Sequence, residues 1–239
     1  MTAAARLETA AAADPRLIVP LDLPDLDQAR AMVEALGEAV SFYKVGLELF
    51  ASGGMTLARD LKAQGKQVFL DWKLHDIGTT VQRSAAVLAD SGCDLLTVHG
   101  EPQVMAAAVR GRGRSSLKIL AVTVLTSLSD EDLAEMGYSE SARTLVERRI
   151  HQAVAAGCDG VVASPHEAQL ARAIGGPDFL VVTPGVRPDW SAKNDQARAA
   201  TPAQALAAGA SHIVCGRPIT GANDPQAAAL RIVAEMAGI

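Results

Sequence analysis

The sequence predicts an α/β protein built as a single (β/α)8 barrel, of the TIM-barrel type, from three observations. Short apolar, β-branched runs recur along the chain. Each run after the first follows a glycine that ends an Ala/Leu-rich helical stretch, as helix C-termini commonly do. The repeat is about 29 residues, the size of one strand-helix unit. Eight such runs fit into 239 residues, a length at which barrels of eight parallel strands form one domain.

The expected strands have the continuous apolar character of strands that are buried on both faces. They are residues 17–21, 42–45, 68–70, 95–98, 119–122, 160–162, 179–182 and 212–214. Two helices also have clear starts, because Thr201-Pro202 and Asp224-Pro225 each place a capping side chain before an N1 proline. We expect residues 1–14 to form a poorly ordered tail and residues 15–239 to form the barrel domain.

A doubly wound open sheet is the alternative architecture for this pattern. Eight strands would be many for one open sheet, and no G-x-G-x-x-G turn follows the first strand. The number of strands and the missing glycine-rich turn therefore favour the closed barrel.

Composition excludes several classes of function. The chain has 22 Lys and Arg against 27 Asp and Glu, a formal net charge of -5, which argues against nucleic-acid and anionic-membrane binding. Aromatic residues make up 3% of the chain, too few for a base-stacking platform. Three widely spaced cysteines without a Cys-x-x-Cys pair predict reduced thiols in a cytoplasmic protein.

Polar residues occur where the predicted strands end, which is the end of a barrel that holds the chemistry. They are Asp22, Lys44, Asp71, Lys73, His99, Thr126, Ser164, Thr183, Gly216 and Arg217. Charged side chains in or just after an apolar strand are costly unless they are paired. We assign no role to His99 or Ser164.

The segment 70–80 is the most informative part of the sequence. Asp71 and Lys73 are two residues apart, so on a strand they point to the same face, and both enter the barrel mouth if Trp72 packs outward. Lys44 is placed to neighbour Asp71, and Asp76 follows the strand. Such a network can keep an ammonium protonated between carboxylates. From the residues alone, a buried salt-bridge network that closes the barrel top is the alternative.

This segment resembles the motif D-x-K-x-H-D-I-[PG]-x-T of the orotidine 5'-phosphate decarboxylase family, of the bacterial type. The resemblance includes residues 42–46, 122–127, 183–188 and 214–219, and it covers residues 17–235 in the order of the family. It implies loss of CO2 from orotidine 5'-phosphate to give UMP, in de novo pyrimidine nucleotide synthesis. It also implies that the reaction needs no metal and no cofactor.

The resemblance implies a catalytic role for four residues. Lys73 would stabilise the carbanion that develops at C6 of the pyrimidine and protonate it. Asp71 would lie near the departing carboxylate, while Lys44 and Asp76 would hold Lys73 in place. In the family, residues at the positions of Asp76 and Thr80 reach into the partner subunit's site, which implies a homodimer.

The resemblance also implies how the substrate is held. The binding residues would be Asp22 and Lys44 at the ribose, Thr126 and Ser127 at the pyrimidine, and Gly216, Arg217, Arg187 and Gln196 at the phosphate. Arg187 and Gln196 lie in the long polar stretch 184–200, a length typical of a loop that closes over a site.

Three rival functions stay open at this point. A Mg²⁺-dependent sugar-phosphate decarboxylase or synthase of the same barrel superfamily shares D-x-K-x-x-D, but has a glutamate where this chain has Lys44. A Schiff-base aldolase would need Lys73 as a neutral nucleophile, which flanking carboxylates oppose. A barrel that only binds a phosphate ligand would not require the charged network.

Overall fold

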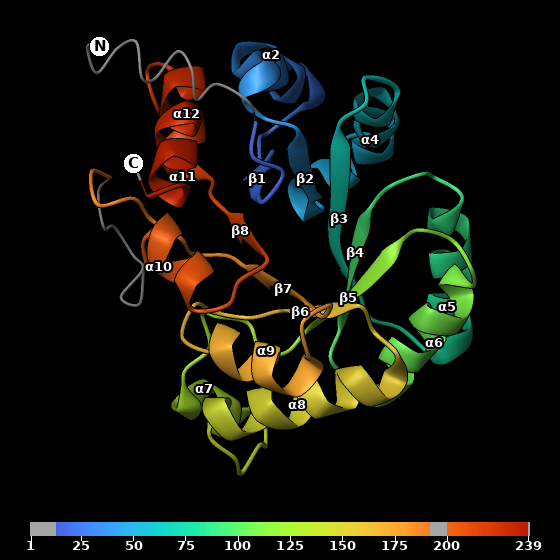
Figure 1. Cartoon of the computed structure of the whole chain (residues 1–239). Coiled ribbons are helices and arrows are strands. Elements are labelled where there is room, and N and C mark those ends of the chain that lie inside the picture. Colours follow the sequence, from blue (N-terminus) through green and yellow to red (C-terminus); the bar gives the residue numbers. More distant parts are fainter. Residues whose placement is uncertain (1–12, 192–199, 239) are drawn as a thin grey trace.

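The barrel expected from the sequence is confirmed. In this computed structural model, which describes residues 13–191 and 200–238, eight parallel strands form a closed barrel in chain order (Figure 1). The first strand pairs with the second and also with the last, which closes the ring. Residues 1–12, most of the expected N-terminal tail, lie outside the described residues.

The eight strands overlap the apolar runs that the sequence marks. They are β1 (Leu17–Pro20), β2 (Phe42–Gly46), β3 (Gln67–Leu74), β4 (Leu95–His99), β5 (Lys118–Val122), β6 (Gly160–Val162), β7 (Leu180–Thr183) and β8 (His212–Val214). The main difference is at β3, which extends beyond the apolar run 68–70 to include Asp71 and Lys73. The charged residues of the motif therefore belong to the strand itself.

Helices surround the barrel on the outside (Figure 1). They are α2 (Leu26–Leu36), α3 (Leu47–Phe50), α4 (Gly54–Ala63), α5 (Gly78–Ala89), α6 (Pro102–Arg112), α7 (Asp130–Glu135), α8 (Ala142–Ala156), α9 (Ala168–Gly175), α10 (Pro202–Ala207), α11 (Arg217–Thr220) and α12 (Pro225–Met236), with a 3-10 turn at Gly37–Ala39. Both expected helix starts are confirmed, because Thr201 accepts a hydrogen bond from the Gln204 amide and Asp224 accepts one from the Ala227 amide. Gly157 ends α8 at a φ of 79°, a conformation that glycine adopts at little cost.

Apolar side chains fill both the inside and the outside of the barrel. The inner core consists of Ile18, Phe42, Phe69, Leu95, Leu120, Val182 and Val214. A larger cluster of mainly aliphatic residues fills the space between the strands and the helices. Because side chains alternate along a strand, the residues two positions after Phe42, Phe69 and Leu95 also point inward, toward the carboxyl end of the barrel. These residues are Lys44, Asp71 and Thr97.

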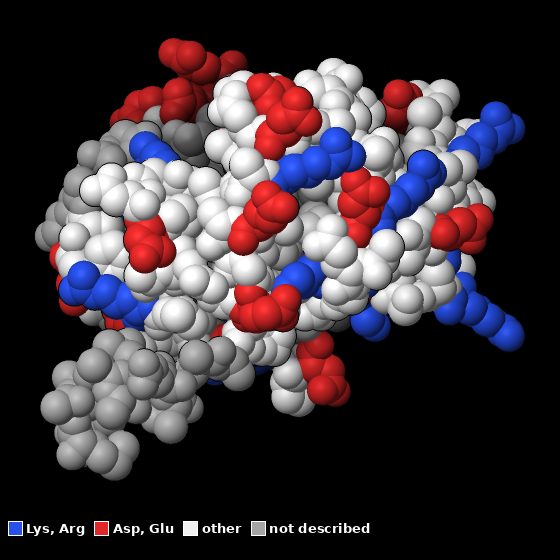
Figure 2. Space-filling view, turned by 90° about the horizontal axis from the view of Figure 1, so that it is seen from above, with Lys and Arg blue, Asp and Glu red and all other residues white. Residues whose placement is uncertain are grey.

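The surface in Figure 2 carries acidic and basic side chains interspersed with one another. Ion pairs join neighbouring helices, as between Arg30 on α2 and Asp60 on α4 at 2.9 Å. Within the described ranges, no helix is both long and apolar enough to cross a lipid bilayer.

Candidate active site

A β-bulge lies where the charged motif meets the next strand. Leu70 pairs with Leu96 and Leu74 pairs with Val98, so four steps along β3 face two steps along β4. Bulges of this kind commonly re-aim side chains beside active sites. Lys73 lies inside the bulge at a φ of 47°, a conformation that costs a non-glycine residue roughly 1–3 kcal/mol. The surroundings must therefore hold Lys73 in this conformation.

Four charged side chains form an alternating chain across β2, β3 and the segment that follows β1. Asp71 Oδ1 accepts a hydrogen bond from Lys73 Nζ at 2.8 Å, and Asp71 Oδ2 lies 3.3 Å from Lys44 Nζ. Lys44 Nζ also donates to both carboxylate oxygens of Asp22, at 3.0 and 3.1 Å. The order is thus Asp22, Lys44, Asp71, Lys73. The fourth charged residue of the network within one chain is therefore Asp22, beside Lys44. The sequence predicts Asp76 as the fourth residue instead.

Asp71 is held in its ionised form. Its side chain is 15% exposed, and this burial by itself raises the pKa of the carboxyl group. The nearby ammonium groups of Lys44 and Lys73, with hydrogen bonds from Lys73 and Thr97, outweigh the burial and hold the pKa of Asp71 below its usual value. Asp71 is therefore a fixed negative charge at neutral pH.

The lowered pKa of Asp71 predicts a pH-dependent contribution to stability. A carboxyl group whose pKa is depressed on folding stabilises the fold above its unfolded-state pKa of about 4, and this contribution is lost as the pH falls through the folded-state value. We expect the difference in unfolding free energy between the native chain and Asp71→Asn to be largest near neutral pH and to narrow below about pH 4. Urea denaturation at a series of pH values measures it, and a pH-independent difference would contradict this prediction.

Close backbone approach at Gly46 allows the Asp22–Lys44 pair to form. A Cβ atom at this position would lie 2.3 Å from Asp22 Oδ1 and 3.0 Å from Lys44 Nζ. Only a hydrogen fits there without displacing the carboxylate. The glycine that ends β2 is thus part of the site's geometry.

Asp76 and Thr80 lie apart from this network in the single chain. Both are exposed, and Asp76 Oδ1 accepts a hydrogen bond from the Ile77 amide at 2.6 Å. No ion pair joins Asp76 to Lys73 among the described residues. Ile77 beside them is 73% exposed, and Leu47 and Phe50 are also exposed apolar side chains.

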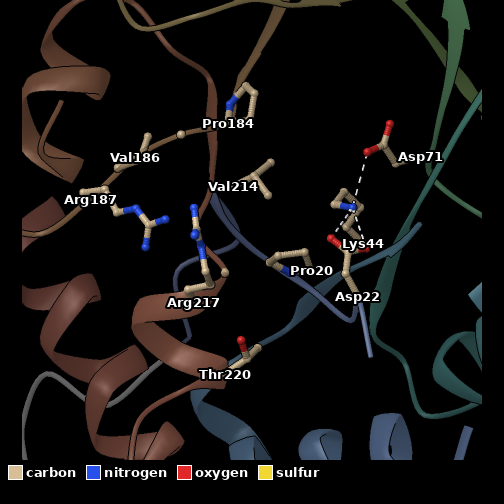
Figure 3. A pocket seen from close by; sticks show the side chains of 12 residues that line it. Pro20, Asp22, Lys44, Asp71, Pro184, Val186, Arg187, Val214, Arg217 and Thr220 are labelled. Carbon is tan, nitrogen blue, oxygen red and sulfur yellow. Dashed lines mark hydrogen bonds and ion pairs between the residues drawn. The ribbon is translucent and has the colours of Figure 1, made fainter. Parts of the chain in front are cut away.

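A cavity of about 320 Å³ opens at the carboxyl ends of the strands beside the network. Its lining consists of Pro20, Asp22, Lys44, Asp71, Pro184, Gly185, Val186, Arg187, Val214, Gly216, Arg217 and Thr220. Figure 3 shows Asp22, Lys44 and Asp71 on one side and the guanidinium groups of Arg187 and Arg217 on the other. The cavity thus has a carboxylate-ammonium side and a strongly basic side, and Arg187 is buried although it lies on a loop.

A second, more apolar cavity of about 200 Å³ adjoins the first at Lys44 and Asp71. Besides these two residues, it is lined by Phe69, Lys73, Val122, Val124, Leu125, Thr126, Val162, Pro184 and Val214. The structure therefore brings Thr126 to the network, while Ser127 is exposed and does not line either cavity. Gln196 lies outside the described residues.

The two ends of the stretch that carries Arg187 are joined to each other. The Arg187 amide donates to the Ala200 carbonyl at 2.9 Å, and Val186 forms a β-bridge with Ala200. Trp190 packs against the core, and the Arg231 guanidinium of α12 lies 4.4 Å from the centre of its ring. These contacts fix the position of Arg187 relative to the cavity.

Within the described part of the chain, His75, His99 and Ser164 form no hydrogen bond or ion pair with the four charged residues of the network. The rings of His75 and His99 lie 4.9 Å apart, and His75 Nε2 is 3.7 Å from Glu101 Oε2. Burial lowers the pKa of His99. The Ser164 amide donates to Glu167 at 2.9 Å. Across the described ranges, no three His, Cys, Asp or Glu side chains gather as a candidate metal site.

Thr97 and Gly46 contact the charged network, and the sequence interpretation gave neither of them a role. Thr97 Oγ1 lies 3.0 Å from Asp71 Oδ1 and 3.0 Å from the Lys73 amide nitrogen. The available signal for Thr97 is a hydroxyl in the apolar run Leu-Leu-Thr-Val. That signal is weak because threonine is common in strands. Gly46 could be found only from the distance between neighbouring strands.

Comparison with known proteins gives a consistent result over nearly the whole chain. The sequence model of the "Orotidine 5'-phosphate decarboxylase / HUMPS family" matches residues 15–232. A protein of Caulobacter vibrioides (strain NA1000 / CB15N) named orotidine 5'-phosphate decarboxylase is 76% identical over 231 residues, which cover 95% of this chain and 99% of the relative. A protein of the same name from Rhodopseudomonas palustris (strain BisB5) is 56% identical over 231 residues, which cover 95% of this chain and 98% of that relative.

The fold comparison agrees with the sequence comparison. The crystal structure of orotidine 5'-phosphate decarboxylase from Lactobacillus acidophilus superimposes with a TM-score of 0.82 at 40% identity, and the match covers 93% of this chain and 99% of that one.

Proposed function

The chain belongs to the orotidine 5'-phosphate decarboxylase / HUMPS family, and from this premise we infer that it converts orotidine 5'-phosphate to UMP and CO2. It is thus a carboxy-lyase of pyrimidine nucleotide synthesis. The observation that carries this function to the site is the alternating chain of Asp22, Lys44, Asp71 and Lys73, which faces two arginines across one cavity.

We propose that Lys73 carries the chemical step. When the bond between C6 and the carboxyl carbon breaks, CO2 leaves and the electron pair stays on C6. No carbonyl or imine adjoins the departing group to accept that pair. The Lys73 ammonium, fixed 2.8 Å from Asp71, supplies positive charge at C6 and then transfers one proton to it. A proton from solvent restores the ammonium. Asp71 and Lys44 orient the Lys73 side chain during this step.

The two cavities suggest how the substrate lies. The phosphate binds on the basic side, at Arg187, Arg217 and the Gly216 amide, with Gln196 as a further expected ligand. The pyrimidine enters the apolar cavity beside Thr126, with Ser127 following it in the same turn. The ribose spans the distance between them, where Asp22 and Lys44 offer hydrogen-bond partners to its hydroxyl groups. This arrangement directs C6 toward Asp71 and Lys73.

The position of Lys44 disfavours the magnesium-dependent rival. Its ammonium lies 3.0 Å from Asp22 and 3.3 Å from Asp71, so a side-chain cation already neutralises the two carboxylates. A divalent cation bound there would be repelled by Lys44 and Lys73. We therefore propose a reaction without metal or cofactor.

A direct assay tests this function. The full-length protein, treated with a chelator, is incubated with orotidine 5'-phosphate while the loss of the orotate chromophore is followed. We expect full turnover in the chelator and no increase on addition of Mg²⁺. Absence of turnover by folded protein would refute the decarboxylase assignment, and turnover only with Mg²⁺ would favour the rival.

We further propose that the active form is a homodimer in which Asp76 and Thr80 complete the partner's site. Three observations support this arrangement. Asp76 and Thr80 are exposed and make no ion pair with Lys73 in their own chain, as described above. Apolar side chains at Ile77, Leu47 and Phe50 are exposed near the same end of the barrel. Among the residues that the structure describes, Lys73 forms an ion pair with one carboxylate, that of Asp71.

Mixing two inactive variants is expected to restore activity if Asp76 acts across the interface. In a mixed dimer of Lys73→Ala and Asp76→Asn chains, the Asp76→Asn chain keeps its Lys73 and receives Asp76 from its partner. About half of randomly assembled dimers are mixed and each holds one complete site, so activity should return to about a quarter of the native level. The assay is turnover after co-refolding of equal amounts of the two chains.

The matched control mixes Lys73→Ala with Asp71→Asn. These two residues form an ion pair within one chain, so no mixed dimer contains a complete site and activity should stay absent. If the Lys73→Ala and Asp76→Asn mixture also stays inactive although dimers form, the cross-subunit role of Asp76 is wrong.

The remaining organisation follows the same proposal. Residues 15–239 act as one catalytic domain, and the protein functions in the cytoplasm with small-molecule nucleotide substrates. All three cysteines, Cys93, Cys158 and Cys215, are free and buried, which suits a reducing compartment.

A further inference from the structure

We propose that Thr97, in the middle of β4, is a positioning residue for the decarboxylation: its hydroxyl holds the β3 bulge and aligns Asp71 between the two ammonium groups. This inference rests on the proposed function, because it concerns the same charged network. Thr97 lines neither of the two cavities described above.

The Thr97 hydroxyl joins the backbone of one functional residue to the side chain of another. Its oxygen accepts a hydrogen bond from the Lys73 amide at 3.0 Å. Its proton is directed to Asp71 Oδ1 at 3.0 Å, while the Leu70 carbonyl lies farther away at 3.5 Å. The carboxylate is the stronger acceptor because it is both closer and charged. One hydroxyl thus contacts Leu70, Asp71 and Lys73, all of them in or beside the bulge.

The bulge explains why a side chain is needed at this point. Between Leu70 and Leu74 the regular pairing with β4 is interrupted, and at this point the Lys73 amide donates to a side-chain oxygen, that of Thr97. Thr97 is fully buried, and a buried amide without an acceptor costs about 1–3 kcal/mol. The Thr97 hydroxyl gives the Lys73 amide an acceptor inside the bulge and so stabilises Lys73 at its φ of 47°.

The same hydroxyl limits the rotation of the Asp71 carboxylate. Oδ1 receives hydrogen bonds from Thr97 and from Lys73 Nζ at 2.8 Å, which directs Oδ2 toward Lys44 at 3.3 Å. Threonine is branched at Cβ and has few side-chain rotamers, so the donor itself is rigid. The Thr97 hydroxyl oxygen therefore holds both the backbone of Lys73 and the carboxylate that pairs with its ammonium group.

Valine at position 97 would keep the shape and remove the hydroxyl. The Lys73 amide would lose its acceptor and Asp71 would lose a donor, so the ammonium of Lys73 would sit less accurately at C6. We expect kcat to fall about 10-fold to 100-fold, the range that a lost buried hydrogen bond gives when it acts on the transition state. KM should stay within about 3-fold, because the phosphate grip lies on the other side of the cavity.

The experiment compares three variants of the full-length protein with the native chain, using orotidine 5'-phosphate. Thr97→Val removes the hydroxyl, and Thr97→Ser keeps it while losing a methyl group. Ser211→Ala is the matched control: the Ser211 hydroxyl also joins a strand amide and a carbonyl, those of Val181 at 2.9 and 3.0 Å, but it precedes β8 at the opposite end of the barrel. Measurements are kcat, KM, the affinity for UMP and the unfolding free energy.

The proposal predicts a lowered kcat for Thr97→Val, recovery of most of the activity in Thr97→Ser, and native kinetics for Ser211→Ala, with UMP affinity preserved throughout. Equal losses in Thr97→Val and Thr97→Ser would overturn it, since packing and not the hydroxyl would then matter. An unchanged kcat in Thr97→Val, or a loss confined to stability, would also overturn it. Turnover by the native chain is measured in the same series, so failure of the decarboxylase assignment is recognised separately.

Discussion

Replacing Lys73 with alanine is expected to abolish decarboxylation while leaving the fold intact. The variant loses both the positive charge at C6 and the proton donor, two effects that each contribute about 10²-fold or more to enzymatic rates. We therefore expect kcat to fall at least about 10⁴-fold. The measurement is single-turnover loss of the orotate chromophore with enzyme in excess.

The control for Lys73→Ala is Lys118→Ala. Lys118 also lies on a barrel strand and also pairs with an aspartate, at 3.2 Å from Asp159, but it starts β5 at the opposite end of the barrel. Lys118→Ala should retain native kcat. If Lys73→Ala kept more than about one hundredth of the native rate, the proton and the charge at C6 would have to come from another group.

Removing both Arg187 and Arg217 is expected to produce the second large loss. Each arginine can make charge-assisted hydrogen bonds to the phosphate, worth about 1.5–3 kcal/mol, which corresponds to about 10-fold to 100-fold. The double alanine variant should therefore lose about 10²-fold to 10⁴-fold in kcat/KM. Part of this loss should fall on kcat, because binding energy from a remote phosphate can organise the reacting end of the substrate.

Orotidine, which lacks the phosphate, distinguishes this explanation from general damage. With orotidine the native chain and the double variant should be equally slow, since neither has a phosphate to bind. Arg30→Ala, which removes an exposed arginine on α2, serves as the protein control and should behave as the native chain. An equal loss on both substrates would show that the arginines act on the fold and not on the phosphate.

Much of the fold could be predicted because its signals are local. A glycine that ends a helix and an apolar run that follows it are read within about 30 residues, and all eight expected strands overlap observed ones. The ends of strands are predicted less accurately than their existence. At β3 the apolar run indicates residues 68–70, but the strand continues to Leu74. The charged residues that extend β3 have partners on the neighbouring strands, Lys44 for Asp71 and Thr97 for the Lys73 amide, and an apolar run does not show such partners.

The site was predicted in part. Alternation along the strand correctly brought Asp71 and Lys73 together, and Trp72 packs outside against Phe50 with ring centres 4.8 Å apart. The backbone conformation differs from the regular strand that the alternation predicts, because Lys73 has a positive φ inside a bulge. A bulge depends on the register between two strands, and a single segment does not encode that register.

The barrel, the family resemblance and the kinds of charge at the strand ends can be predicted from the amino-acid sequence, because contiguous residues carry each of these signals. The folded structure is needed for the order Asp22, Lys44, Asp71, Lys73, for the cavity with Arg187 and Arg217 on its other side, and for the contacts of Thr97. Lys44, Asp71 and Thr97 come from three neighbouring strands and Asp22 follows a fourth, and the distances between their side chains are set by strand register and by backbone approach at Gly46. Those quantities arise from packing across the barrel, so they become visible only when the chain is folded.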